Sequence, residues 1–467
     1  MTLTATAPPQ DGAAAGHALY PPTVRPPPQP LPLRRFLFTF VRNPLSSLPQ
    51  AVYEEPLVVL GNSRHGLVWV TAPTLTEQVL LHASAQFPKT PLEKRVFRHT
   101  LGDGILTSEG ASWRWQRRTA APLFRPADLA HFLPAMTAAA ARQIARWRTH
   151  APGTIAAVDR DMTQTTFQVI SDTMFAGSAD AEAAAILEAA DGALATISWE
   201  IAAAMLRLPP WLWYPGKFRR RRAARRLRQA VGAILTRRRA DGLAGDDLLA
   251  RLARAQVPET GEPMSQKQLV DNLLTFLAAG HETTAKALTW TLYLIARAPQ
   301  WQERILAEVV AVAGAGAIAA PELDRLHVTR AVLKEAMRLY PPAPVMTRVV
   351  AEDIELGGHL LKAGTLILIP IFAVHRHKAL WQDPNRFDPE RFRPECEAAH
   401  ARTQFMPFGF GPRTCIGNSF AMMEAMALLA SFVRAARFEW DGVHLPEPVS
   451  RVTLRPKGGM PLKVWLR

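Results

Sequence analysis

Residues 408–417 read Phe-Gly-Phe-Gly-Pro-Arg-Thr-Cys-Ile-Gly, and they are the most informative segment of this sequence. Its glycines supply backbone freedom and close approach that residues with side chains lack. The apolar, methionine-rich pattern after Cys415 predicts a helix. The first N–H groups of that helix would favour the thiolate form of the cysteine. A thiolate held in a loop by backbone donors is what a haem iron requires as its proximal ligand.

The same stretch resembles the cysteine loop of the cytochromes P-450, the haem-thiolate monooxygenases. The family pattern is Phe-x-x-Gly-x-Arg-x-Cys-x-Gly, and its fixed positions are filled by Phe408, Gly411, Arg413, Cys415 and Gly417. The plainer interpretation, a buried inert cysteine beside a glycine turn, leaves these five matches unexplained. The resemblance covers residues from about 35 to the end. It implies a mainly α fold with small β-sheets, with haem b between a long central helix and the helix of the cysteine ligand.

The predicted central helix follows a capping box formed by Ser265 and Gln268, and it continues to the residue before Pro299. Within it, Ala-Gly-His-Glu-Thr-Thr at 279–284 resembles the oxygen-activation motif of the family. The motif precedes the cysteine loop by 135 residues, counted from Gly280 to Cys415, much as in the family. By resemblance, Glu282 and Thr283 are the catalytic acid–alcohol pair that delivers protons to bound oxygen.

Glu335 and Arg338 stand three residues apart and therefore on one face of a predicted helix. Such a pair is often a surface contact of little energetic weight. The resemblance instead implies the internal ion pair of the family, completed by Arg391 from the segment Pro-Glu-Arg-Phe at 389–392. Its role would be structural, holding the proximal loop.

Indole and guanidinium donors suit the propionates of haem. The resemblance assigns cofactor binding to residues of four segments: Trp113, Arg117, Arg348, Phe408, Arg413 and Gly417. It also places a set of mostly apolar residues around the substrate pocket: Thr275, Phe276, Ala279, Ala343, Val345, Met346 and Val452. The implied reaction inserts one atom of O2 into an apolar small molecule, as a hydroxylation.

The bulk composition agrees with one intracellular domain. Residues 1–34 are rich in proline and predict a flexible arm, which leaves 35–467 as a single haem domain. With only Cys396 and Cys415, a disulfide framework is excluded. No signal peptide and no apolar segment of membrane-spanning length is visible, so we expect a soluble, cytoplasmic protein of the bacterial type without a transmembrane anchor. Short apolar runs predict a hairpin at 57–60 and 67–70, and strands near 354–356, 365–369, 452–454 and 462–465.

The formal net charge is +15, and eleven Lys or Arg lie between Lys217 and Arg239 with no acid among them. A basic run can bind nucleic acid or an anionic membrane. Apolar residues recur through it at helical spacing, which favours an amphipathic helix with a solvated basic face: Ala224, Leu227, Val231 and Ile234. No nucleic-acid-binding module is visible, so a basic membrane- or nucleic-acid-binding protein is the weaker hypothesis.

The chain has about 50 residues after Cys415, too few for a reductase domain. We therefore expect a separate electron donor, an acidic ferredoxin or flavodoxin with its NAD(P)H-dependent reductase, which would contact the helix of Arg114 and Arg118. A peroxide-driven enzyme of the same fold is the alternative. Relatives of that kind usually lack the acid–alcohol pair, whereas Glu282 and Thr283 are both present.

Overall fold

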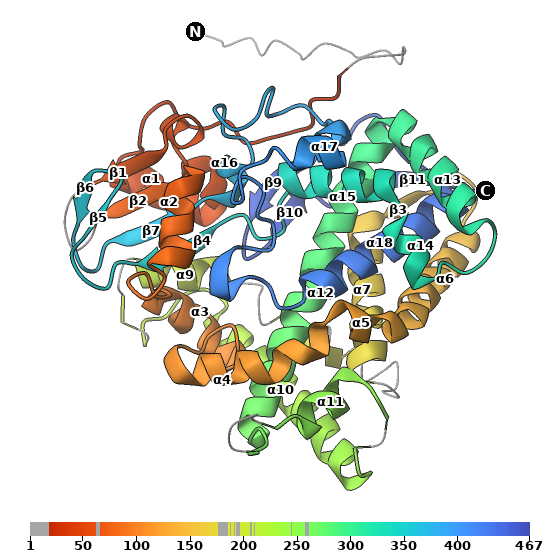
Figure 1. The fold of residues 1–467 in the computed structure, drawn as a ribbon, viewed down its shortest axis with the longest axis horizontal. Coiled ribbons are helices and arrows are strands. Elements are labelled where there is room, and N and C mark those ends of the chain that lie inside the picture. The colour runs from red at the N-terminus through yellow and green to blue at the C-terminus, as the bar shows by residue number, and fades with distance from the viewer. Residues whose placement is uncertain are drawn as a thin grey trace.

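A helix of 32 residues, α12 (Gln266–Arg297), runs through the centre of the molecule (Figure 1). This computed structural model describes residues 18–467 except 62–65, 176–184, 187, 191, 193–196, 206–207, 210, 244 and 257–260. The predicted capping box is present, because Ser265 and Gln268 each bond the backbone N–H of the other. The helix ends at the predicted place, with Ala298 as its C-cap before Pro299.

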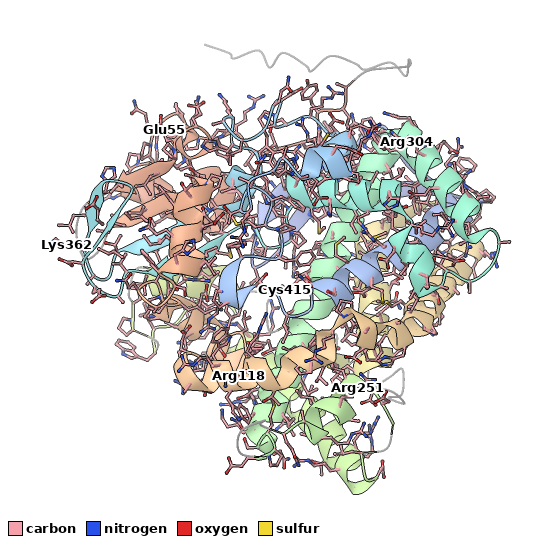
Figure 2. All side chains as sticks on the ribbon, in the orientation of Figure 1. Glu55, Arg118, Arg251, Arg304, Lys362 and Cys415 are labelled. Atoms are coloured by element: carbon pink, nitrogen blue, oxygen red, sulfur yellow. The ribbon has the colours of Figure 1, made fainter. Side chains whose placement is uncertain are left out.

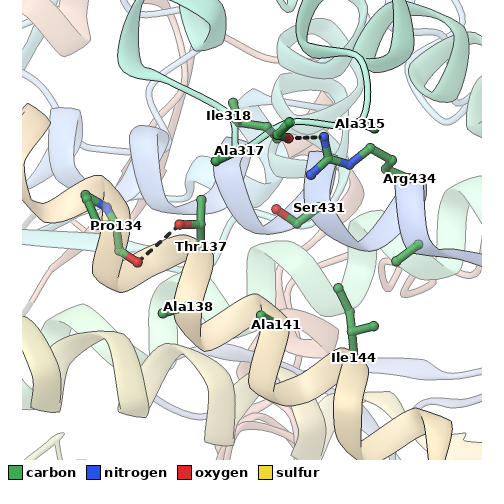
Figure 3. A pocket seen from close by; sticks show the side chains of 12 residues that line it. Pro134, Thr137, Ala138, Ala141, Ile144, Ala315, Ala317, Ile318, Ser431 and Arg434 are labelled. Atoms are coloured by element: carbon green, nitrogen blue, oxygen red, sulfur yellow. Dashed lines mark hydrogen bonds between the residues drawn. The ribbon is translucent and has the colours of Figure 1, made fainter.

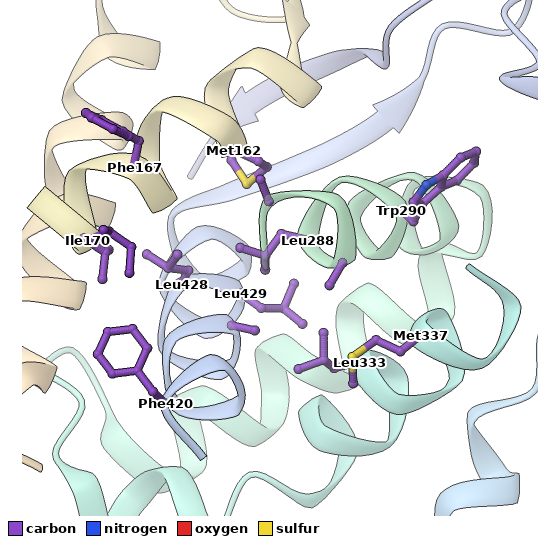
Figure 4. Close-up of a cluster of buried hydrophobic side chains, with 14 of the residues drawn as sticks. Met162, Phe167, Ile170, Leu288, Trp290, Leu333, Met337, Phe420, Leu428 and Leu429 are labelled. Atoms are coloured by element: carbon purple, nitrogen blue, oxygen red, sulfur yellow. The ribbon is translucent and has the colours of Figure 1, made fainter. Parts of the chain in front are cut away.

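Helices from the whole chain pack around α12. The contacting helices are α3 (Pro91–Leu101), α7 (Val158–Met174), α10 (Lys217–Ala240), α11 (Leu248–Arg254), α13 (Pro299–Ala313), α15 (His327–Leu339) and α18 (Asn418–Ala435). Buried Leu288 of α12 lies among apolar side chains of α7, α15 and α18 (Figure 4), and buried Trp290 stacks on Tyr340. Because this contact buries apolar surface on several sides of α12, the helix is held in a fixed position.

The remaining helices are mostly peripheral. They are α1 (Leu33–Arg42), α2 (Pro73–Glu77), α4 (Gly110–Ala120), α5 (Pro126–Leu129), α6 (Leu133–Arg148), α9 (Ile197–Met205), α14 (Ala320–Asp324), α16 (Ile371–Val374) and α17 (Pro394–Glu397). Within the described ranges, no helix is both long and apolar enough to cross a lipid bilayer.

The β structure is confined to small sheets, and the largest has the strand order β1-β2-β7-β4. Its strands are β1 (Leu57–Leu60), β2 (Leu67–Val70), β7 (Leu366–Ile369) and β4 (Met346–Val349). The predicted hairpin is confirmed, since β1 and β2 are antiparallel with Leu60 opposite Leu67. The smaller sheets contain β3 (Ile155–Ala157), β11 (Pro461–Leu466) and β8 (Ala436–Trp440); β9 (Glu447–Ser450) and β10 (Leu454–Lys457); and β5 (Ile354–Leu356) and β6 (His359–Leu361). The predicted mainly α fold with small sheets is therefore confirmed.

Two local predictions differ from the structure by a few residues. The strand expected at 452–454 begins only at Leu454, because a tight turn precedes it in which the N–H of Arg451 bonds the carbonyl of Thr453. The helix expected near Cys415 begins at Asn418, since the chain first makes a short 3-10 turn at Gly411–Arg413 and an irregular segment.

The flexible arm predicted for residues 1–34 is wrong for its described part before α1, residues 18–32, which lie on the globular body. The Tyr340 hydroxyl donates to the carbonyl of Pro22 at 2.6 Å, and the Phe387 N–H donates to Leu19 at 2.9 Å. Val24 is buried in the main core. Proline-rich composition correctly excludes a helix here, but it does not reveal that the carbonyls of the segment find donors elsewhere. Residues 1–17 lie outside the described part of the chain.

The predicted amphipathic basic helix is confirmed as α10. Ala224, Leu227, Val231 and Ile234 are all buried, and the helix packs on α12 and α3. Arg220 is also buried, where it pairs with Glu200 and bonds the hydroxyl of Tyr214.

Candidate active site

The cysteine loop is held by backbone geometry that requires glycine. The N–H of Cys415 donates to the carbonyl of Phe408 at 2.8 Å, which closes the loop. Gly411 has φ +76°, and a Cβ at this residue would lie 2.1 Å from the carbonyl oxygen of Leu80. Gly409 has φ +74° and lies close to the sulfur of Met346. By contrast, Gly417 has φ −93° and only an ordinary contact with Phe124. Two of the glycines are thus explained by the fold of the loop itself.

The side chain of Cys415 is solvent-accessible, although protein surrounds it closely enough to desolvate the sulfur. Burial raises the pKa of the Cys415 thiol, whereas the backbone N–H of Gly417 and the charge of Arg117 lower it. The predicted backbone donor is therefore present. The predicted preference for the thiolate form is wrong for the protein alone, because desolvation of the sulfur has a larger effect on its pKa than Gly417 and Arg117 together. A cationic metal at the sulfur would reverse this balance.

Three arginines that were predicted to bind the cofactor lie around the loop: Arg117, Arg348 and Arg413. The positive charges of Arg117 and Arg348 both act to lower the pKa of Arg413. Arg117 of α4 donates to the carbonyl of Thr414 at 2.8 Å. Arg413 donates to the carbonyl of Ser108 at 3.0 Å and stacks on the ring of Trp113 at 4.1 Å. Burial lowers the pKa of each guanidinium, which indicates that the charges are partly desolvated. Such a cluster favours bound carboxylates.

The central helix is open to solvent at the predicted motif. Ala279 is exposed and Gly280 and Thr283 are half-buried, while most of α12 is buried. The cysteine segment approaches α12 on both sides of this window: Phe124, which lies near Gly417, contacts Phe276, and Glu424 of α18 contacts Thr284. Figure 2 labels Cys415 in the loop that leads into α18. The accessible sulfur and the accessible window of α12 therefore lie in the same region of the molecule.

The two members of the acid–alcohol pair point to different partners. The Thr283 hydroxyl donates to the carbonyl of Ala279 at 2.7 Å within the helix. The Glu282 carboxylate is buried, accepts from the Thr453 hydroxyl at 2.6 Å and pairs with Arg455. Burial raises the pKa of Glu282, but Arg455 and the Thr453 bond outweigh it and leave the pKa below its ordinary value. Glu282 is thus anionic at neutral pH and connected through half-exposed Arg455 to solvent.

Glu335, Arg338 and Arg391 are brought together as the resemblance implies. Glu335 and Arg338 are fully buried and joined by two bonds of 2.6 and 2.8 Å, and Arg391 lies 3.7 Å from Glu335. Arg338 also donates to the carbonyls of His375, Pro384 and Arg386. The resemblance also implies that the arginine of the pair bonds the 389–392 segment, but the carbonyls that Arg338 binds belong to residues that precede this segment.

The predicted pocket residues divide into accessible and covered positions. Ala343 is exposed with Ala279, and three others are half-buried: Val345, Met346 and Val452. Thr275 and Phe276 are buried. The backbone at Gly104 closes against Thr275, whose hydroxyl bonds the carbonyl of Asp271. These two residues are therefore core positions in this structure.

A surface pocket of about 430 Å³ between α6, α18 and residues 315–318 contains none of the predicted site residues (Figure 3). A second pocket, of about 530 Å³, lies beside Arg118 and α11. Neither one includes Cys415 or the window of α12.

Comparison with known proteins identifies the family. The family model for cytochrome P450 matches residues 25–462. This chain belongs to the cytochrome P450 family. Like the relatives that carry names of activities, it is a P450 monooxygenase. A cyclooctat-9-en-7-ol 5-monooxygenase of Streptomyces melanosporofaciens is 33% identical over 86% of this chain and 87% of that protein. A cytokinin hydroxylase of Arabidopsis thaliana is 31% identical over 86% and 80%. The crystal structure of the cytochrome P450DA heme domain superposes with a TM-score of 0.83 at 25% identity, over 96% of this chain and 98% of that one.

The family implies a haem cofactor, and the residues of this P450 fit one. Cys415 supplies an accessible sulfur, and three partly desolvated arginines supply positive charge beside it. The window at Ala279 supplies an apolar face. The chemistry of the donor set is thus that of a haem-thiolate site.

Several residues that position this site were not predicted from the sequence. Thr453 and Arg455 bind Glu282 from a segment 171 or more residues away, and no local pattern indicates them. Ser108 and Glu109 bind Arg413 in the same way. Glu424 did have a signal, since it is the only acid in the apolar helix α18. It is completely buried, and burial raises its pKa well above the ordinary value.

Proposed function

We propose that this P450 hydroxylates an apolar small molecule with O2 and with electrons from a separate protein. The observation that carries the proposal is the apolar, accessible surface of α12 at Ala279 in the region of the accessible Cys415 sulfur. Haem b would be held by Cys415 and would supply the oxidative chemistry. Arg117, Arg348 and Arg413 would hold its propionates, with Trp113 packed against Arg413. Phe408 and Gly417 would hold the loop, since each gives a backbone group to Cys415.

The substrate would contact Ala279, Ala343, Val345, Met346 and Val452. These side chains offer neither charge nor strong donors, so binding would come from burial of apolar surface. The names of the relatives include cyclooctat-9-en-7-ol, cytokinin and 11-oxo-beta-amyrin. Because these names describe different compounds, they do not identify the substrate of this chain.

Glu282 and Thr283 would move protons to the site from solvent. Glu282 is anionic and linked to half-exposed Arg455, so it can exchange protons with the surface when that ion pair opens. Among the described residues, the bond recorded for the Thr283 hydroxyl goes to a helix carbonyl, and rotation of the side chain would turn the proton toward the window. This arrangement supports a reaction that starts from O2 and consumes protons, rather than one that starts from peroxide.

The proposal is tested with isotopically labelled dioxygen. The haem-loaded chain, an acidic ferredoxin and its NAD(P)H-dependent reductase are combined with fatty acids, terpenes, steroids and aromatic compounds that give a spectral shift on binding. We expect one labelled oxygen atom in the product of a binding compound. Product that forms only with added peroxide, or product without label, would instead establish the peroxide-driven alternative.

A further inference from the structure

The surface pocket of about 430 Å³ in Figure 3 has the size of a small-molecule site, and it shares no lining residue with the window of α12. One wall is the outer face of α6, where exposed Pro134, Ala138 and Ala141 recur at helical spacing. The other wall is the last turn of α18, and the loop of residues 315–318 after α13 forms the rim. Three separate segments of the chain thus surround one cavity.

The walls of this pocket consist mainly of small apolar residues. Seven of the twelve lining residues are alanine, glycine or proline, and two more are isoleucine. Small side chains leave a space that larger ones would fill. The two hydroxyl groups of the lining, those of Thr137 and Ser431, already donate to carbonyls of their own helices. Such walls favour the apolar part of a ligand, because its burial removes hydrocarbon from water.

The single charged residue of the lining is Arg434, which is half-buried at the end of α18. Its Nη1 donates to the carbonyls of Gly314 and Gly316, at 3.2 and 2.6 Å, and so holds the loop at the rim. Among the described residues no carboxylate pairs with Arg434, and no bond is recorded for its Nε or Nη2. The pocket therefore combines apolar walls with one cation that lacks a carboxylate partner.

We propose that this pocket binds an apolar carboxylate, with the hydrocarbon part against α6 and the carboxylate on Arg434. Arginine presents N–H donors in a planar fork that matches the two oxygens of a carboxylate. A neutral apolar compound would leave these donors unused, and a small inorganic anion would leave the apolar walls uncovered. A ligand with both parts satisfies the whole lining. The inference is independent of the reaction at Cys415.

The test is equilibrium dialysis of the full, haem-loaded chain with decanoate and, separately, with the methyl ester of decanoate. Dialysis counts every bound molecule, whereas the absorbance of the haem reports only on binding beside the iron. We expect decanoate to occupy a site that leaves the haem absorbance unchanged. We expect the ester to bind this site at least about tenfold more weakly, because it lacks the charge that Arg434 recognises.

Two variants of the lining are compared with two matched controls on α6. R434Q should weaken the binding of decanoate by about tenfold and leave that of the ester unchanged, since only decanoate uses the charge. Its control, R148Q, removes an exposed arginine outside the pocket and should keep both affinities. A141W should fill the pocket and abolish this binding of both compounds. Its control, A145W, changes an exposed alanine outside the lining and should keep it.

Equal loss of decanoate binding in R434Q and R148Q would show attraction by net charge alone and would overturn the proposal. Equal affinity of the parent chain for decanoate and its ester would do the same, because Arg434 would then not be used. Binding that survives in A141W would place the site elsewhere. Decanoate that changes the haem absorbance in proportion to all of its binding would show that it occupies only the haem site. The haem absorbance of every ligand-free variant verifies that it is folded.

Discussion

Removal of the Glu335 carboxylate should destabilise the haem loop far more than removal of a superficial acid. All five N–H donors of Arg338 are used: two bonds go to Glu335, and three go to backbone carbonyls of His375, Pro384 and Arg386. Glu335 also accepts from the N–H of Asp388 at 2.8 Å. Glu335→Ala therefore leaves a fully buried cation and a backbone N–H without their acceptor.

The expected cost is about 3–5 kcal/mol, the usual penalty for breaking a buried pair from one side. This is a large part of a total stability of about 5–15 kcal/mol. The damage should reach the cysteine loop through hydrogen bonds. Arg338 binds the carbonyl of His375, whose Nε2 accepts from the N–H of Met406 at 3.0 Å. The carbonyl of Met406 in turn accepts from Gly409 inside the loop.

The assay is the ratio of bound haem to protein, together with the temperature at which haem absorbance is lost. The control is Glu397→Ala, which breaks a partly exposed pair with Lys334 on the same helix α15 and should cost about 0–1 kcal/mol. We expect Glu335→Ala to yield little haem-loaded protein and the control to resemble the parent chain. Equal haem content and equal midpoints in the two variants would show that the Glu335–Arg338 pair does not hold the haem loop.

Four further outcomes are expected. Cys415→Ser should abolish the red-shifted absorbance of the reduced carbon monoxide complex, while Cys396→Ser, an exposed position, should keep it; a surviving band in the first variant would exclude Cys415 as the ligand. Thr283→Ala should still bind substrate and consume NAD(P)H but release more peroxide and less product, and an unchanged product yield per electron pair would exclude the proton role. The rate of reduction by an acidic ferredoxin should fall steeply as salt rises, and the variant R114Q with R118Q should be reduced more slowly than the parent chain at low salt. A reduction rate that does not change with salt would contradict docking at the helix of Arg114 and Arg118. Burial lowers the pKa of His375 from 6.5 to about 3, so the folded state holds the neutral ring and loses stability as pH falls below about 6.5. His375→Gln should flatten that loss of unfolding temperature in acid, and an unchanged pH profile would show that His375 does not contribute.

Local patterns in the sequence predicted the parts of this structure that depend on residues close together in the chain. The capping box at Ser265, the pair of Glu335 with Arg338 and the glycine turn at Gly411 each involve a few neighbouring residues. Helical spacing also identified the buried face of α10. In each case the physical cause is contained in the segment itself, as a repeat of side-chain direction or as a backbone conformation that glycine adopts without strain.

Contacts between distant segments were not predictable in the same way. Helical periodicity places Thr275 and Ala279 near one another on α12, yet Gly104 covers the first and leaves the second accessible. The partners of Glu282 lie on β10 and in the turn before it, and nothing in the 279–284 motif indicates them. Many of these contacts end on a backbone carbonyl, which every residue possesses, so they leave no signature in the sequence.

The three arginines beside Cys415 show how such contacts change a functional interpretation. From the sequence, Arg413 is an obvious partner for a propionate because it belongs to the cysteine motif itself. In the structure it already pairs with Glu109 at 2.7 Å and bonds Ser108. Arg117 and Arg348 donate to backbone carbonyls, those of Thr414 and Thr347, and the structure records no ion pair for either among the described residues. Glu93 and Glu109 lie close enough to Arg348 to stabilise its charge, but neither is bonded to it. A partly desolvated cation without a bonded carboxylate gains more from an incoming one than a cation that already has such a partner. We therefore infer that Arg117 and Arg348 contribute more to haem affinity than Arg413, whose main role is to fix α4 against the loop.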